Sequence, residues 1–127
     1  MDDGGEQWQV LIGKTADDND RLSLEEGRPH ETWLHVAGVA GSHAVIRDPT
    51  GARRGAPSEV VRIAASYCAW YSKAKNQAKA EVHVVTCGQV SKTRGAPAGQ
   101  VRLSGRVDKL SVKPTDPQKK QGAKGKR

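Results

Sequence analysis

Residues 31–46, ETWLHVAGVAGSHAVI, place two imidazoles beside an indole and a hydroxyl in one short segment. His35 and His43 could bind a metal ion, activate Ser42, contact a phosphate or belong to the core. Zinc needs three or four grouped ligands, and the segment offers only these two, so we predict no metal and no cofactor. Adjacent residues of a strand point to opposite faces, which makes Ser42 and His43 a poor nucleophile–base pair. The sequence therefore favours a non-catalytic role.

A second candidate site is the glycine-punctuated basic segment KTRGAPAG at residues 92–99. Glycines let backbone amides approach a phosphate, and Lys92 and Arg94 would add positive charge. The segment lacks the Gly-Lys-Ser/Thr ending of a P-loop. Lys14, in Gly-Lys-Thr, shares that ending, but nothing upstream of it matches the motif. The pattern indicates phosphate contact rather than nucleotide hydrolysis.

Charge is distributed unevenly along the 127 residues, whose net charge is +7. Residues 1–26 carry eight acidic side chains against Lys14 and Arg21, a net charge of −6, which leaves +13 for the remainder. This asymmetry favours a polyanionic partner, nucleic acid before a membrane surface. No apolar run approaches the roughly 18 residues of a membrane span, and the acidic N-terminus is unlike a secretory signal. We therefore expect a cytoplasmic protein without a membrane partner.

The hydrophobic pattern predicts an α+β fold with about six strands, mostly antiparallel, one long helix and one short helix. Residues 1–6 form an expected acidic, flexible N-terminus, 7–113 the domain, and 114–127 a disordered basic tail. A turn at residues 15–20 precedes a short helix that Asn19 or Asp20 would cap, and Ser58 would cap the long helix, to about residue 75. Strands are expected at residues 7–13, 32–36, 43–47, 80–86, 100–103 and 107–112, with 32–36 and 43–47 forming one hairpin and the last two another.

Several of these residues occur in an order that resembles the NFACT RNA-binding domain family. The shared pattern includes a helix rich in Ala that ends in Ser-Lys-Ala, a Val-rich strand, a Lys-containing loop and a Gly-x-Val turn. Ala40 departs from it where the family usually has Pro. The matching segments are Gly13-Lys14, Asn19-Asp20 with Leu22, Trp33-Leu-His35, Gly41-Ser-His43-Ala-Val-Ile46, Pro57, residues 64–74, residues 82–86, Lys92 and Gly99-Gln-Val101.

The resemblance implies an RNA-binding module without catalysis, whose partner is ribosomal or transfer RNA and possibly the large ribosomal subunit. Large family members act in rescue of stalled chains, and their other domains do not fit in this chain. The candidate RNA contacts are Lys14, Asn19, Asp20, Trp33, His35, Gly41, Ser42, His43, Lys73, Lys75, Lys92 and Arg94.

Alternatives remain open at this point. The same charges would serve a DNA-binding or general polyanion-binding module, and the acidic N-terminal segment could dock a basic protein. A small hydrolase-like enzyme would instead use His35 and His43 with Ser42. Trp33 and both imidazoles could be core residues, and Lys73 and Lys75 could merely complement a helix dipole.

Overall fold

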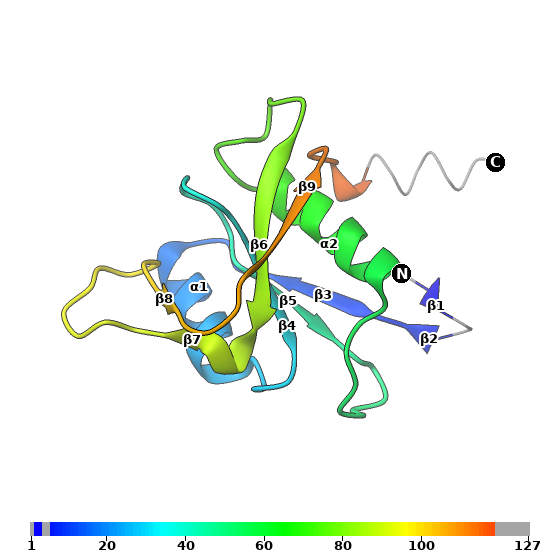
Figure 1. Cartoon of the computed structure of the whole chain (residues 1–127), viewed down its shortest axis with the longest axis horizontal. Coiled ribbons are helices and arrows are strands. Elements are labelled where there is room, and N and C mark those ends of the chain that lie inside the picture. Colours follow the sequence, from blue (N-terminus) through cyan, green and yellow to red (C-terminus); the bar gives the residue numbers. More distant parts are fainter. Residues whose placement is uncertain (1, 4–5, 119–127) are drawn as a thin grey trace.

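A five-stranded antiparallel sheet and helix α2 form the framework of the computed structural model, which describes residues 2–3 and 6–118 (Figure 1). This arrangement confirms the predicted α+β fold. The sheet contains, in spatial order, Gln9–Ile12 (β3), Ala44–Arg47 (β5), Thr32–Val36 (β4), Ala80–Thr86 (β6) and Asp108–Val112 (β9). Two short antiparallel pairs join Asp2–Asp3 (β1) to Glu6–Gln7 (β2), and Val90–Ser91 (β7) to Arg102–Leu103 (β8).

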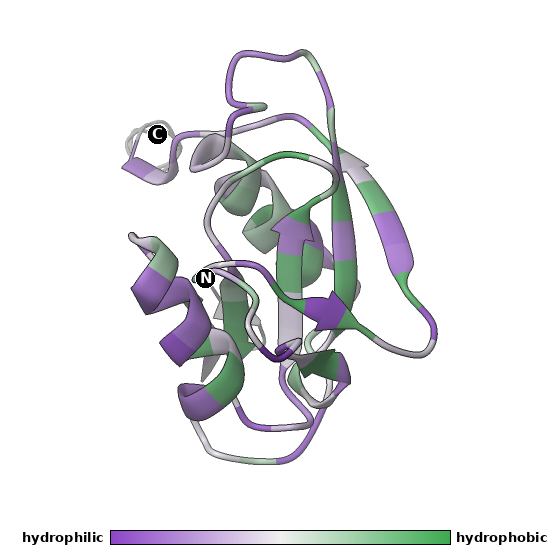
Figure 2. Ribbon diagram, turned by 90° about the vertical axis from the view of Figure 1, so that its left-hand side faces the viewer, coloured by the Kyte–Doolittle hydropathy of each residue, from purple (hydrophilic) through white to green (hydrophobic). Residues whose placement is uncertain are grey.

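Side chains alternate between the two faces of the sheet, and each face builds its own core. Leu34 and Ile46 belong to the larger cluster, which packs against α2, Ser58–Trp70. Trp33 and Val45 point to the other face and pack with Leu22 and residues around β7. In Figure 2 the strands accordingly show alternating hydrophobic and hydrophilic bands. Central strands buried on both faces explain why residues 32–36 and 44–47 read as apolar runs.

The long helix is shorter than the sequence predicted, and Ser58 is its first residue rather than its cap. Pro57 occupies the N-cap position in an extended conformation, and the helix ends at Trp70. Beyond it, the Tyr71 carbonyl accepts a hydrogen bond from Ser42 N at 3.1 Å, and Lys73 N donates to the Ala40 carbonyl at 3.0 Å. The chain thus exchanges helical hydrogen bonds for strand-like bonds to residues 40–42, which periodicity alone could not reveal.

The turn predicted at residues 15–20 is helical, so the predicted cap at Asn19 or Asp20 is wrong. The Thr15 hydroxyl accepts a hydrogen bond from Asp18 N at 3.0 Å and caps α1, Ala16–Arg21. A π-helical turn, Leu22–Glu26 (η1), continues it. A Thr followed three residues later by an acidic residue is a known helix-start pattern, so this signal was present in the sequence.

The predicted hairpin of residues 100–103 and 107–112 does not form, because β8 pairs with β7 whereas β9 pairs with β6. The Gln89 amide nitrogen donates to the carbonyls of Ser104 and Arg106 at 2.6 and 2.7 Å, and it holds the intervening segment between the two sheets. Gln89 belongs to a short 3-10 turn, Cys87–Gln89 (η2).

Parts of the two terminal segments lie within the described residues. Residues 2–3 pair with residues 6–7. Pro114 is buried and Thr115 N donates to the Ser66 carbonyl at 3.1 Å, so residues 114–118 continue the domain. The tail lysines from Lys119 onward lie outside the described residues.

Candidate nucleic-acid interface

One group of hydrogen bonds, which we call the knot, joins Gly13, Asn19, Gly41 and His43. The Asn19 side-chain oxygen accepts from His43 N at 3.0 Å, and its Nδ2 donates to the Gly41 carbonyl at 3.3 Å. Gly13 N donates to the His43 carbonyl at 3.0 Å. A Cβ on Gly13 would lie 2.1 Å from the Asn19 amide oxygen, so only glycine fits there. These motif residues fix the backbone that leads into β5.

Trp33, His35 and His43 form an aromatic cluster beside this knot. The His43 ring lies 5.0 Å from both the Trp33 and the His35 rings, in edge-on geometry. Trp33 Nε1 donates to the Ser23 hydroxyl at 2.7 Å, and the same hydroxyl bonds His43 Nδ1 at 2.7 Å. Because Ser23 accepts the indole proton, its own proton is available to Nδ1. The buried Ser23, which sequence reasoning missed, thus joins both rings.

The knot and the cluster correct part of the predicted RNA-binding set. Four of those residues are buried: Asn19, Trp33, Ser42 and His43 are 7%, 1%, 8% and 1% exposed. Trp33 has no face on which a base could stack, and the amides of Ser42 and His43 are already hydrogen-bonded within the chain. In this structure these four residues are packed inside the fold and leave little surface for a ligand.

Burial keeps the two imidazoles of the cluster uncharged. Burial, together with the neighbouring His43 and His83, lowers the pKa of His35 to about 4. Burial also lowers the pKa of His43, although hydrogen bonding to the backbone of Asn19 and the charge of Asp20 oppose it. Neither ring therefore supplies positive charge at neutral pH. The Ser23 hydroxyl occupies His43 Nδ1, so this nitrogen is not available to act as a base for Ser42.

Lys92 pins the loop of residues 92–100 and is not a free cation. Its ammonium donates to Asp20 Oδ2 at 3.0 Å and to the carbonyls of Pro97 and Gln100 at 2.5 and 3.0 Å. A lysine has three N–H donors, and all of these are used. Asp20 Oδ1 accepts from Gly99 N at 3.0 Å. Burial raises the pKa of Asp20, but the Lys92 ammonium and the Gly99 amide outweigh it, and the pKa lies below its ordinary 3.8. Lys92, predicted as a phosphate contact, and Asp20, predicted as an RNA contact, form an ion pair with each other in this structure.

Exposed cations and aromatics gather around the C-terminal end of α2. Lys14 Nζ lies 5.5 Å from the centre of the Tyr71 ring, and Lys75 Nζ lies 4.6 Å from that of Trp70. Lys73, which lies between Tyr71 and Lys75 in the sequence, is exposed, and Trp70 and Tyr71 are half-exposed. We call Lys14, Trp70, Tyr71, Lys73 and Lys75 the lysine–aromatic surface. Sequence reasoning identified its lysines but missed both aromatics, although a Trp-Tyr pair before a lysine-rich segment was a visible signal.

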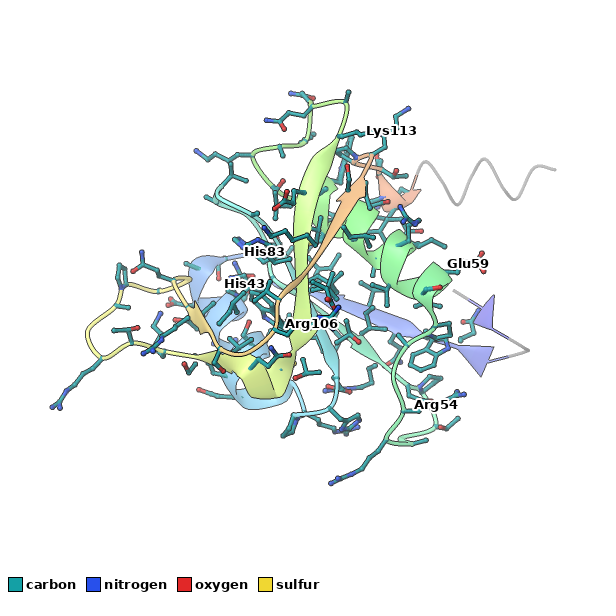
Figure 3. All side chains as sticks on the ribbon, in the orientation of Figure 1. His43, Arg54, Glu59, His83, Arg106 and Lys113 are labelled. Atoms are coloured by element: carbon teal, nitrogen blue, oxygen red, sulfur yellow. The ribbon has the colours of Figure 1, made fainter. Side chains whose placement is uncertain are left out.

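The 92–100 loop lies next to this surface. A Cβ on Gly99 would lie 3.2 Å from the Ala16 side chain, so the loop packs against the start of α1, two residues after Lys14. Arg94 is exposed on that loop. In Figure 3 the labelled His43 lies on the side of β6 from which the loop projects. Of the predicted contacts, Lys14, Lys73, Lys75 and Arg94 therefore remain exposed cations.

Two further features bear on other chemistries. In the part of the chain that the structure describes, no three His, Cys, Asp or Glu side chains are grouped so as to hold a metal ion. Among the same residues, no helix has the length and apolar character needed to cross a membrane. Cys68 and Cys87 are free and buried, and burial raises the pKa of each thiol to about 12.

Comparison with known proteins gives a consistent family. The sequence model described as the NFACT protein RNA binding domain matches residues 3–105. The chain is 32% identical over 108 residues to the Rqc2 homolog RqcH of Streptococcus suis, which covers 84% of this chain and 18% of that protein. It is also 32% identical over 93 residues to the Rqc2 homolog RqcH of Bacillus subtilis, covering 72% of this chain and 15% of that protein.

A solved structure has the same fold. It is the C-terminal part of the fibronectin/fibrinogen-binding protein from Streptococcus suis, with a TM-score of 0.80 and 30% identity over 91% of this chain and 45% of the other. The chain spans less than a fifth of the length of the curated relatives described above. The matched family, the relatives and the shared fold agree, and the chain belongs to the NFACT protein RNA-binding domain family.

Proposed function

We propose that this protein binds structured RNA, either ribosomal or transfer RNA, through the lysine–aromatic surface and Arg94, and that it does so without catalysis. The observation that carries this proposal is the exposed group of Lys14, Tyr71 and Lys73 beside the 92–100 loop. Membership of a family described as RNA-binding supports the choice of ligand. The net charge of +7 suits a polyanion.

The proposed contacts are of two kinds, charged side chains for phosphates and an aromatic ring for a base or ribose. Lys14, Lys73 and Arg94 are exposed and would neutralise phosphates, which gives affinity with little sequence preference. Tyr71 is half-exposed and would stack on an unpaired base or pack against a ribose. The buried knot and the Lys92–Asp20 pair hold these elements in place before RNA arrives, so that little ordering entropy is lost on binding.

Association with the ribosome in the cytoplasm is the setting that we propose for this activity. The relatives named above are Rqc2 homologs, and the family resemblance implies contact with the large ribosomal subunit and transfer RNA during rescue of stalled chains. The matched segment is a small part of those proteins, so only the RNA-binding role is proposed for this chain.

Binding assays with RNA and DNA of equal length test this proposal. We expect purified protein to bind transfer RNA more tightly than duplex DNA of equal charge. Replacing Lys14 and Lys73 with Met should weaken RNA binding about 10-fold or more, because each lost phosphate contact removes a favourable ion-release term. Arg53→Met is the matched control, because Arg53 is exposed on the β5–α2 connection, away from the 92–100 loop (Figure 1).

Two results would count against RNA binding. Equal affinity for DNA would favour a general polyanion-binding module. A different outcome is that the protein binds neither nucleic acid but captures a protein partner, with binding that persists after nuclease treatment. That result would favour a protein-interaction role. Because the Streptococcus suis protein of the matching structure is named a fibronectin/fibrinogen-binding protein, fibronectin and fibrinogen are suitable probes for that experiment.

A further inference from the structure

The face of the sheet opposite α2 is only partly covered. Near β7 and η1 it is closed by the cluster around Trp33 and Val85. Elsewhere on the same face, His83 is half-buried and Lys109 is exposed. His83, labelled in Figure 3, lies on β6 directly opposite His35 of the aromatic cluster. A partly open polar area therefore adjoins the aromatic cluster.

The strand register places three nitrogen-bearing side chains in one row across this area. His35 on β4 lies directly opposite His83 on β6, and His83 lies directly opposite Lys109 on β9. Directly opposed residues of antiparallel strands have Cβ atoms about 4.5–5.5 Å apart and point to the same face. The row thus presents two imidazole rings followed by an ammonium group.

The inner end of the row is held rigidly. The His35 ring packs edge-on against the buried His43 ring at 5.0 Å and lies 6.0 Å from the Trp33 ring. His35 itself remains partly exposed. The low pKa of His35, about 4, which burial and the neighbouring imidazoles cause, leaves it a neutral flat ring at pH 7. A neutral ring offers a stacking face and both a donor and an acceptor nitrogen.

We propose that the row of His35, His83 and Lys109 binds an unpaired nucleotide of RNA, with the base on the imidazoles and the phosphate on Lys109. This inference rests on the proposed function and adds a second contact area to it. Sheet faces that bind single strands combine ring side chains for the bases with cations for the backbone. The row has both, and it contains no acidic residue.

The neighbouring acid does not close the site. Glu81 lies two residues from His83 on the same face, with 3.8 Å between its Oε2 and His83 Nε2, and its side chain is 53% exposed. A contact of that length at the surface is weak. A nucleotide could therefore displace Glu81 from His83. Arg106, whose Nε is paired with Asp108 at 2.9 Å, is not needed by the proposal.

The test compares affinities for a single-stranded and a hairpin RNA oligonucleotide of equal length, measured by fluorescence anisotropy. His83→Ala should weaken binding of the single strand about 5- to 50-fold, because loss of one stacked base has an effect of that size. His83→Phe, which keeps a flat ring, should stay within about threefold of wild type. Lys109→Gln should lower the salt dependence by about 0.7 log units per decade of salt. Arg53→Gln is the control for charge.

A second measurement uses the unaltered protein and does not depend on the folding of any variant. Photocrosslinking of 4-thiouridine RNA followed by peptide mass spectrometry should mark the segments that carry His35, His83 or Lys109. Crosslinks confined to the 92–100 loop and to residues 70–75, with His83→Ala and Lys109→Gln behaving as Arg53→Gln does, would overturn this inference and leave the proposed function standing. Absence of binding by wild-type protein to either RNA would instead overturn the proposed function.

Discussion

Replacing Lys92 with Met distinguishes a lysine that stabilises its loop from a lysine that contacts phosphate. The ammonium donates to Asp20 and to two carbonyls of its own loop at 2.5 to 3.0 Å. Met keeps the length of the stem but removes all three bonds. We therefore expect Lys92→Met to destabilise the protein, whereas removal of a solvent-exposed phosphate contact would leave stability unchanged.

The magnitude follows from how exposed the pair is. The Lys92 and Asp20 side chains are 27% and 22% exposed, so the ion pair lies between a surface pair and a buried one. Surface pairs contribute about 0–1 kcal/mol, and breaking a buried pair costs about 3–5 kcal/mol. We expect a loss of about 2 kcal/mol, which for a domain of this size lowers Tm by about 8 °C.

Urea unfolding followed by tryptophan fluorescence measures this loss. Arg94→Met is the matched control, because Arg94 is exposed on the same loop, and it should change stability by less than about 0.5 kcal/mol. Lys92→Met and Asp20→Asn combined should be less destabilising than the sum of the single changes by about 1 kcal/mol. A Lys92→Met variant as stable as wild type, with additive effects in the double variant, would refute the assignment of Lys92 as a pin.

Three further predictions concern stability and protonation. Gly13→Ala should cost about 1–3 kcal/mol in thermal unfolding, because the new methyl group would lie 2.1 Å from the Asn19 amide oxygen; an unchanged Tm would contradict this. NMR titration should give His35 a pKa near 4, because its ring is largely buried and lies beside two other imidazoles; a value near 6.5 would show that the ring is solvated. The hydrogen bond from Arg54 lowers the pKa of Asp48 to about 2, so its stabilisation is complete above about pH 4 and is lost as the pH falls through 2. Asp48→Asn should remove that part of the acid dependence, and an identical pH profile would argue against the ion pair.

The sequence was sufficient for the framework and for the position of the histidines. Two short apolar, β-prone runs separated by a small-residue turn predicted the hairpin of residues 32–36 and 43–47, and this hairpin brings the rings of His35 and His43 to 5.0 Å. The Ala-rich pattern located α2 but not its end, because Tyr71 and Lys73 form bonds to residues 40–42 that lie far back along the chain.

Roles of individual polar residues were much harder to predict, since their partners are distant in sequence. Lys92 and Asp20 are 72 positions apart, and Asn19 and His43 are 24 apart. A local pattern shows that such residues are polar or charged, but it cannot show that their hydrogen bonds are used internally. Trp33 shares this ambiguity, because an indole serves equally as core or as a stacking surface until its burial is known.

The salt dependence of RNA binding shows whether the lysine–aromatic surface and Arg94 contact phosphates. Transfer RNA affinity would be measured from about 50 to 300 mM KCl for wild type and for a variant with Lys14, Lys73 and Arg94 all changed to Met, once equal thermal stability is shown. Each lost phosphate contact should reduce the slope of log affinity against log salt by about 0.7–0.9, so we expect the slope of the triple variant to be smaller than that of wild type by about 2 to 3. An unchanged slope and affinity in the folded variant would contradict RNA binding by this surface.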